Sequence, residues 1–370
     1  MNKKIFSIFI FCIFFLINAL CVEKQGRTLR DGLRPPQGER LKIQLIFNCH
    51  LINSEETFKK IMVPLLEKNG IVFVDKNPDV ILVCGSPIKH MCTFNKPHIL
   101  LDEEEFASAS GRRKKCLKNP NLLALFKNTI LRPKSLYTQS IIHHYKLIMD
   151  DFLVFETLNH ETLTQKEKQK IQPVLWDIYR SAFKEEFEPL KDMTIDFERK
   201  RPIDAFFAGK ITNKQNPPGI HREKLLEVLG SIKKALPNKK IISHRGRLPK
   251  DKYLKLLRTS KIVISPWGNG EWCWRDYEAI YSGAVVIKPN SDFVHAVPDL
   301  YRNNKYYVAC NPDFSDLEEK ISYVVENYEK FIDMRKNARN LLINHWGYEK
   351  IAHNLATAIR RVLKKNKNKN

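Results

Sequence analysis

The hydrophobic positions of this chain form short apolar runs separated by amphipathic stretches, and they fall into two series. The first series contains LKIQLIFNC (41–49), GIVFV (70–74), PDVILVCG (78–85) and PHILLD (97–102), with a helical pattern at about 54–69. Short apolar runs separated by helices or turns are typical of parallel strands that are buried on both faces. This half of the chain is therefore predicted to form a parallel α/β domain.

A second series begins after residue 200 and is more regular. Its apolar runs are DAFFAG (204–209), KKIISHRG (239–246), KIVISPWG (261–268), GAVVIKP (283–289) and YYVAC (306–310), with helices predicted at 219–236, 249–259, 274–282 and 315–331. Strands and helices that alternate with short connections predict a doubly wound sheet. Between the two series, residues 120–200 have helical patterns of mixed spacing and predict no definite element. The fold class is thus α/β, with two Rossmann-like domains that face each other across a cleft.

The amino terminus differs from both series. Lys3 and Lys4 precede an apolar run over residues 5–22, which is the pattern of a signal peptide or signal anchor. Residues 23–40 are polar, contain two adjacent prolines and are predicted to be a stem or linker. The predicted order is then an N-terminal domain over 41–200, a C-terminal domain over 201–350, and a helix with a basic tail over 351–370.

Charge and cysteine content narrow the function classes. The net charge of +22 would attract polyanions, although a lysine-rich solvated surface explains most of it. No pattern of a nucleic-acid-binding module is present, and a leader would separate the protein from nucleic acid, so no such partner is expected. Cysteines outside the leader are irregularly spaced without a CxxC pair, which argues against a zinc site and leaves a disulfide open.

Glycines and cations follow four predicted strands of the C-terminal half. Gly209 and Lys210 follow the first strand, residues 244–247 the second, residues 266–271 the third, and Lys288 ends the fourth. Glycine allows backbone N–H groups to approach a phosphate, and arginine or lysine neutralises a diphosphate without a metal. These strand ends therefore predict a nucleoside-diphosphate site with no metal ligands.

The helix predicted at 274–282 contributes a carboxylate beside this site. Arg275 and Glu278 are three residues apart and share one helical face. A carboxylate there accepts hydrogen bonds from both hydroxyls of a ribose, whereas the alternative is an ion pair between the two on the helix surface. Trp267 and Trp272 either stack on a base or sugar or belong to the core, and Trp274 is predicted to be core.

The segment DKYLKLLRTSKIVISPWGNGEWCWRDYEAIYSGAVVIKP (251–289) resembles the donor domain of GT-B glycosyltransferases, most closely exostosin-like and family-one-like enzymes. The resemblance extends over about 203–345, whereas for 41–200 it concerns the architecture alone. It implies that Glu278 lies near the ribose and that cations lie near the diphosphate. The residues expected to bind the donor are Gly209, Lys210, Arg222, Arg245, Ser265, Trp267, Gly268, Gly270, Glu278 and Lys288.

The resemblance implies transfer of a sugar from a nucleoside-diphosphate sugar to a glycan, protein or lipid, with the nucleotide sugar as substrate and no cofactor. Arg275 and Glu271 are the expected catalytic residues. If the reaction inverts the anomeric centre it needs a general base, and the candidates are Asp102 and His143, with His50 and His144 as further choices.

With its leader, such a protein is expected in the lumen of the secretory pathway. It would be a type II protein of the Golgi or ER membrane, held through residues 5–22, or it would be secreted if the leader is cleaved.

Alternative functions follow from the same residues. Gly268, Asn269 and Gly270 begin a dinucleotide-binding fingerprint whose third glycine position is Cys273, so an NAD-dependent oxidoreductase is the enzymatic alternative. The other alternative is a relative that binds a sugar nucleotide without turnover.

Overall fold

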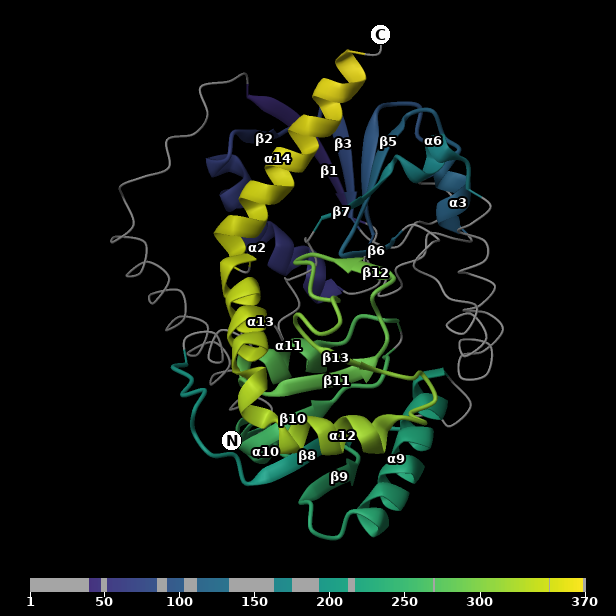
Figure 1. Ribbon diagram of the computed structural model, residues 1–370. Coiled ribbons are helices and arrows are strands. Elements are labelled where there is room, and N and C mark those ends of the chain that lie inside the picture. The colour runs from purple at the N-terminus through teal and green to yellow at the C-terminus, as the bar shows by residue number, and fades with distance from the viewer. Residues whose placement is uncertain are drawn as a thin grey trace, which may run out of the picture. The chain divides into compact units, whose positions relative to one another are not determined.

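The computed structural model of the protein describes residues 40–47, 52–84, 92–102, 112–132, 163–174, 193–211, 217–268, 270–345 and 347–368 (Figure 1). By its internal contacts the chain divides into residues 1–39 and residues 40–370, and all the described residues belong to the second unit. The predicted leader and almost all of the predicted stem lie outside the described residues. Within the part that the structure describes, no helix is both long and apolar enough to cross a membrane.

The first sheet is parallel, and within the described residues its strand order is β2-β1-β3-β4-β5-β7. Successive residues of its buried strands point to opposite faces, so that alternate side chains of β3 contact α2 on one face and α3 on the other. The elements of this half are β1 (Leu41–Phe47), α2 (Ile52–Lys68), β2 (Ile71–Phe73), β3 (Val80–Cys84), β4 (His98–Asp102), α3 (Arg112–Leu117), β5 (Leu122–Lys127), β6 (Thr129–Leu131), α6 (Gln165–Lys168) and β7 (Ile171–Pro173).

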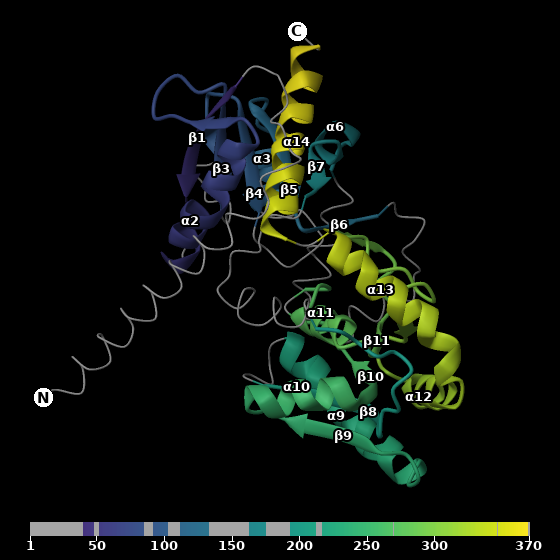
Figure 2. The ribbon, with the colours of Figure 1, turned by 90° about the vertical axis from the view of Figure 1, so that its left-hand side faces the viewer.

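The second sheet is also parallel, and in the described residues its order is β13-β11-β10-β8-β9. Phe206 and Phe207 show its two-sided burial, because the first packs toward α10 and α11 and the second toward α9 and α12. Figure 2 shows these helices beside the strands of the sheet. The elements are β8 (Ile203–Gly209), α9 (Pro217–Ala235), β9 (Ile241–Arg245), α10 (Lys250–Thr259), β10 (Ser260–Ile264), α11 (Trp274–Tyr281), β11 (Val285–Pro289), β12 (Val294–Ala296), β13 (Val308–Cys310), α12 (Leu317–Glu326) and η3 (Tyr328–Phe331).

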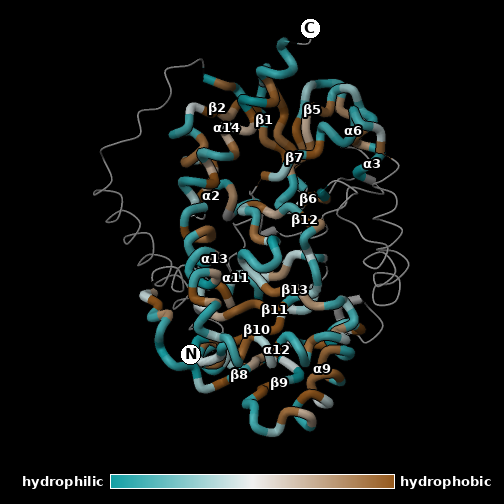
Figure 3. Tube along the Cα trace, viewed as in Figure 1, coloured by the Kyte–Doolittle hydropathy of each residue, from teal (hydrophilic) through white to brown (hydrophobic). Residues whose placement is uncertain are grey.

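The prediction of parallel, doubly wound α/β sheets is confirmed. The strands that the apolar runs predicted are present, and much of β10 and β11 is coloured as hydrophobic in Figure 3. Strands β5 and β7 lie in the region for which the sequence predicted no element. Strand β7 has only three residues, and the sequence of this region has no regular alternation of helical and strand patterns.

The carboxyl-terminal helices α13 (Ile332–His345) and α14 (Tyr348–Lys367) return the chain to the first sheet. The buried face of α14 packs against α2, and Arg360 donates a hydrogen bond to the carbonyl oxygen of Asn69 at the end of that helix (Figure 1). Strand β12 also pairs antiparallel with β6 of the first half. The helix predicted at 351–370 therefore begins at Tyr348 and is a structural part of the N-terminal half as well.

The carboxyl end of α11 is held by three arginine side chains, one from the segment before β8 and two from α13. Their guanidinium groups donate to the last carbonyl groups of the helix and its following turn, which a helix end leaves without internal partners. These bonds are Arg339 Nε to Tyr281 O (3.3 Å), Arg201 Nη2 to Ser282 O (2.6 Å) and Arg335 Nε to Gly283 O (2.8 Å). Because α11 is anchored at this end, its amino end is held in a fixed place beside the sheet.

A disulfide joins Cys92 to Cys116, between the segment before β4 and helix α3. The sequence left such a bond open. Cys273 and Cys310 are free thiols, and the second of these is buried.

Candidate functional site

The strand order of the second sheet reverses between β8 and β10. The chain passes from β8 outward to β9 and then returns to the other side of β8 to form β10. In open α/β sheets, ligands bind outside the carboxyl ends of the strands at such a reversal. The carboxyl ends here are Gly209 of β8 and the loop that begins at Ser265 after β10. The topology thus places the candidate site beside the first turn of α11.

Arg275 lies at this reversal. Its Nη2 donates to the carbonyl oxygen of Ala208 in β8 at 2.8 Å, and its Nη1 donates to the Cys273 sulfur at 3.9 Å. The guanidinium also lies 5.0 Å from the centre of the Phe207 ring. The side chain is covered, since Arg275 is 8% exposed. Arg275 therefore links the end of β8 to the beginning of α11 and presents a small part of its surface to solvent.

The charge of Arg275 is maintained by its neighbours. Burial by itself would lower the pKa of its guanidinium, but nearby Cys273, Tyr253 and Glu278 outweigh burial and raise that pKa. A charged arginine fixed at the carboxyl end of a parallel strand is suited to hold an anionic group.

Glu278 lies one turn further along α11 and is half-buried. Its Oε2 accepts a hydrogen bond from the hydroxyl group of Tyr253, which comes from the first turn of α10. Since Arg275 is buried and Glu278 is half-buried, this face of α11 is covered by other residues. The alternative prediction of an exposed ion pair between Arg275 and Glu278 therefore does not hold.

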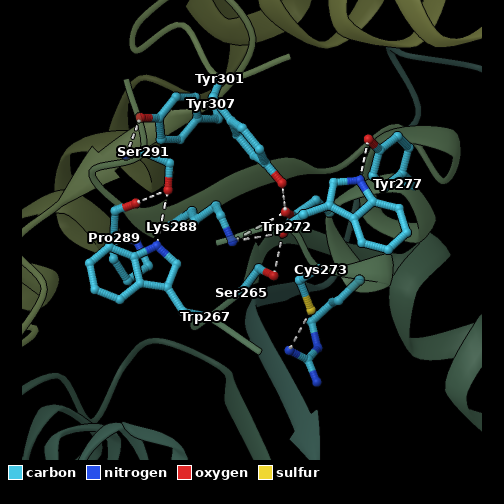
Figure 4. A network of polar contacts seen from close by, with 12 residues as sticks. Ser265, Trp267, Trp272, Cys273, Tyr277, Lys288, Pro289, Ser291, Tyr301 and Tyr307 are labelled. Carbon is cyan, nitrogen blue, oxygen red and sulfur yellow. Dashed lines mark hydrogen bonds and ion pairs between the residues drawn. The ribbon is translucent and has the colours of Figure 1, made fainter. Parts of the chain in front are cut away.

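The side chain of Asp276 is the centre of a polar network with Ser265, Lys288 and Tyr301, which are labelled in Figure 4. It is fully covered, at 1% exposed. It accepts hydrogen bonds from Ser265 Oγ at 2.5 Å and Tyr301 Oη at 2.6 Å, and it forms an ion pair with Lys288 at 3.2 Å. This network joins β10, α11, β11 and the segment before β13.

Two residues that the sequence assigned to donor binding belong to that network. Lys288 is 0% exposed and pairs with Asp276, and the Ser265 hydroxyl is buried and donates to the same carboxylate. The prediction that their side chains bind the donor is therefore corrected. They hold the loop after β10 against α11, because a buried lysine is stabilised by a carboxylate partner inside the protein.

The tryptophans also differ from the prediction. Trp267 is 0% exposed, and its Nε1 donates to Ser291 Oγ at 3.0 Å, so it is core and does not stack on a base or sugar. Trp272 is buried and donates to Tyr277 Oη at 2.5 Å. Trp274, predicted to be core, is half-buried and packs edge-on against Trp272, with a centroid distance of 4.5 Å. The tryptophans thus stabilise the loop after β10 by packing.

The glycines of the loop have a role within the backbone. Gly268 N–H donates to the carbonyl oxygen of Gly270 at 3.0 Å, so this amide is already used inside the loop. The prediction that it faces a phosphate is corrected, and the same bond weakens the dinucleotide fingerprint. Gly270 and Glu271 are both buried in this loop.

Gly209 is buried and closely surrounded by side chains, and its approach to a phosphate stays a prediction. A Cβ at this position would lie 2.8 Å from Cζ of Phe207 and 3.3 Å from Nη2 of Arg275. The following residue, Lys210, is exposed, and its ammonium has no partner among the described residues. A buried glycine and an exposed cation thus stand next to each other at the end of β8.

The remaining predicted cations lie toward β9. Arg222 of α9 donates to the carbonyl oxygen of Lys210 at 2.7 Å, and so fixes the turn after β8. Arg245, at the end of β9, pairs with Glu223 at 2.5 Å and has a side chain that is 51% exposed. Glu223 neutralises Arg245, which leaves Lys210 and Arg275 as the cations at the strand reversal.

The carboxylate of the candidate base Asp102 already forms ion pairs with two cations. It is buried and accepts hydrogen bonds from Arg113 Nε and Lys127 Nζ, both at 2.5 Å. These two cations overcome the effect of burial and hold the pKa of the Asp102 carboxyl far below its usual range, which makes it a poor proton acceptor. Asp102 is therefore corrected to a structural residue of the first sheet. His50, His143 and His144 lie outside the described residues.

Sequence reasoning gave no role to Asp276 or Tyr253. Both stand in the segment that carried the resemblance, and an aspartate in the first turn of a helix had the ordinary explanation of a favourable charge near the helix dipole. A possible signal was the pairing of Asp276 with a lysine in the next apolar strand, since a charged residue in such a strand requires a buried partner.

Comparison with known proteins gives one family match. A family model described as glycosyl transferase-like matches residues 214–357, the segment that runs from α9 into the first half of α14 and contains the loop after β10. No curated protein matches the chain. The described residues contain no group of three or more histidine, cysteine, aspartate or glutamate side chains arranged to hold a metal ion.

Several solved structures are similar at a low level. An α1,3-fucosyltransferase covers 90% of this chain and 93% of its own, with 16% identity and a TM-score of 0.47. An α-glucosyltransferase in complex with UDP-glucose and DNA containing an abasic site covers 87% and 99%, with 9% identity and a TM-score of 0.43. A glycosyltransferase from Rickettsia africae ESF-5 covers 88% and 99%, with 15% identity and a TM-score of 0.41. Likenesses this low assign no substrate.

Proposed function

We propose that this protein is a glycosyltransferase whose glycosyl transferase-like segment, residues 214–357, moves a sugar from a nucleoside-diphosphate sugar to a glycan, protein or lipid acceptor. The observation that carries the proposal is the family match over the segment that contains Arg275 and Glu278. The position of Arg275 at the strand reversal supports it, because this is where an α/β sheet binds an anionic ligand.

In glycosyl transfer, the bond between the anomeric carbon and the diphosphate oxygen breaks and its electron pair leaves with the diphosphate. An acceptor hydroxyl oxygen forms the new bond and loses its proton. The protein must therefore stabilise a leaving dianion and a sugar with oxocarbenium character. We assign the dianion to Lys210, the remaining N–H groups of Arg275 and the amino end of α11, with Gly209 allowing close approach.

The remaining roles concern the nucleoside and the sugar. Glu278 is assigned to the ribose hydroxyls, since a carboxylate accepts from both. No contact with the transferred sugar is assigned to Glu271, because its side chain is buried in the loop after β10. These cations and dipoles are proposed to act on the donor without a metal ion, in a GT-B arrangement of the two α/β halves.

We further propose that the protein works in the lumen of the secretory pathway, as a type II membrane protein held by residues 5–22 or as a secreted protein. The hydrophobic leader supports this location. The disulfide between Cys92 and Cys116 is consistent with it, because disulfides persist in oxidising compartments.

The direct test is a thermal-shift screen of the protein with UDP, GDP, CMP, their sugars and NADH, each with and without EDTA. A stabilising shift with one nucleoside diphosphate and its sugar, retained in EDTA, is the expected result. Release of that nucleotide in the presence of a glycan acceptor then demonstrates turnover and excludes the inactive relative. A shift with NADH alone would replace the transferase by the oxidoreductase.

A further inference from the structure

Tyr253 lies beside the candidate donor site although it belongs to a different helix from Arg275 and Glu278. It stands in the first turn of α10, where its backbone N–H donates to the carbonyl oxygen of Pro249 at 2.9 Å. Its ring lies 5.9 Å from that of Phe206 in β8, so the side chain is oriented by the sheet itself. Helix α10 follows β9 directly, and its amino end is therefore at the same edge of the sheet as the amino end of α11.

The hydroxyl of Tyr253 meets the carboxylate of Glu278 and donates a hydrogen bond to Oε2. Hydrogen bonds to an ionised acceptor are shorter and stronger than neutral ones. Burial first, and then the nearby Glu278 carboxylate, raise the pKa of the Tyr253 hydroxyl well above its usual value. The phenol thus keeps its proton throughout the working pH range and acts as a donor at all times.

The hydrogen bond from Tyr253 restricts the conformations of the Glu278 side chain. A glutamate on a helix samples several rotamers, and ordering it on ligand binding costs free energy. In this structure the ordering is already done, because one carboxylate oxygen is held by a residue that the sheet and α10 fix in place.

We propose that Tyr253 is a positioning residue of the donor site, which holds the Glu278 carboxylate in the orientation that receives the ribose of the nucleotide. The inference rests on the proposed function, because it requires Glu278 to contact a ribose. Its measurable consequence is selectivity: Tyr253 contributes to the preference for a ribonucleotide over a deoxyribonucleotide, and this contribution passes through Glu278.

The test is isothermal titration calorimetry of the full-length protein with UDP and GDP and with their 2′-deoxy and 3′-deoxy counterparts. The variants are Y253F, E278Q and the double variant, with Y328F as the matched control. The Tyr328 hydroxyl is also buried in the C-terminal half and has no hydrogen-bond partner among the described residues. Urea denaturation of each variant verifies that it is folded.

For the ribonucleotide that binds the wild type, Y253F is expected to bind about 2- to 10-fold more weakly, the size of ordering one flexible side chain. Its affinity for the deoxy counterparts, which keep only one of the two hydroxyls assigned to Glu278, is expected to fall by less, so that the selectivity ratio falls. In the E278Q background, Y253F is expected to have no further effect, since coupled residues are not additive.

The two proposals fail in different ways. If the wild type binds none of the nucleoside diphosphates, the proposed function fails and the role of Tyr253 fails with it. If the wild type binds one of them but Y253F behaves as Y328F does, or its effect adds fully to that of E278Q, the positioning role alone is overturned.

Discussion

The guanidinium of Arg275 donates a hydrogen bond to the carbonyl oxygen of Ala208, 2.8 Å away, and so joins the first turn of α11 to the last residues of β8. This bond crosses the point where the strand order of the sheet reverses. A residue expected only to contact a ligand is therefore also part of the framework of the site. Its removal should change both ligand binding and stability.

Arg275→Ala is expected to lower donor affinity and turnover by at least tenfold and to reduce the free energy of unfolding. Loss of a buried, charge-assisted hydrogen bond costs about 1.5–3 kcal/mol. Calorimetric titration with the nucleotide found in the thermal-shift screen, together with urea denaturation, measures both effects. Arg258→Ala is the matched control, since Arg258 is an exposed arginine on α10. Normal donor affinity in Arg275→Ala would remove Arg275 from the site.

Gly209→Ala should damage the same place by adding a single methyl group. The new Cβ would lie 2.8 Å from the Phe207 ring and 3.3 Å from the Arg275 guanidinium, closer than side chains tolerate without a shift. We expect a loss of stability of about 1–3 kcal/mol and weaker donor binding, because Arg275 must move.

Gly230→Ala provides the control for that substitution. Gly230 lies within α9, and a Cβ there meets no atom within 4 Å. Alanine is favoured over glycine in a helix, so this variant should gain about 0.5–1 kcal/mol in the same urea titration. Equal behaviour of the two variants would show that Gly209 has no special contact.

The apolar runs predicted both sheets because their central strands, such as β3 and β11, are buried on two faces and therefore nearly continuous in hydrophobicity. The same pattern could not assign the polar residues between strands. Lys288 and Arg275 are both cations at the end or the beginning of an element, yet one is enclosed with Asp276 and the other lies at the strand reversal. The two cations differ in the residue that the fold brings next to each of them, and that residue is distant in the sequence.

Removing only one member of the Asp276–Lys288 ion pair is expected to reduce the free energy of unfolding strongly. Lys288→Met leaves the buried Asp276 carboxylate without its cation, which typically costs about 3–5 kcal/mol. The comparison is Lys261→Met, which breaks a more exposed pair with Asp204 and should cost no more than about 1 kcal/mol. Urea denaturation of both variants measures the difference, and similar losses would contradict a structural role for the buried pair.

The disulfide between Cys92 and Cys116 should stabilise the N-terminal half. Closing a loop over a sequence separation of 24 residues contributes about 3 kcal/mol in the chain-entropy description. The double variant Cys92→Ala, Cys116→Ala is therefore expected to unfold at lower urea, and dithiothreitol should destabilise the wild type but not this variant. Mass spectrometry of the alkylated protein verifies the bond, and two free thiols at these positions in the untreated protein would disprove it.

His221 is expected to make the protein sensitive to acid. The ring is fully buried, stacks on Phe314 at 4.6 Å and has its Nε2 2.9 Å from the carbonyl oxygen of Pro312. Burial lowers the pKa of its imidazole from 6.5 to about 3, and the charges of Lys288 and Arg222 act in the same direction.

Between these two pH values the unfolded chain binds a proton at His221 that the native protein does not bind. The stability that depends on the neutral imidazole is therefore present above pH 6.5 and is lost as the pH falls toward 3. Relative to His221→Phe, which lacks this proton site, the wild type should lose about 2 kcal/mol of unfolding free energy between pH 7 and pH 5. Urea denaturation of both proteins at the two pH values measures this difference. A difference that is constant with pH, or that grows in acid, would mean that the native imidazole is charged and that the surrounding strand ends are more polar than the structure indicates.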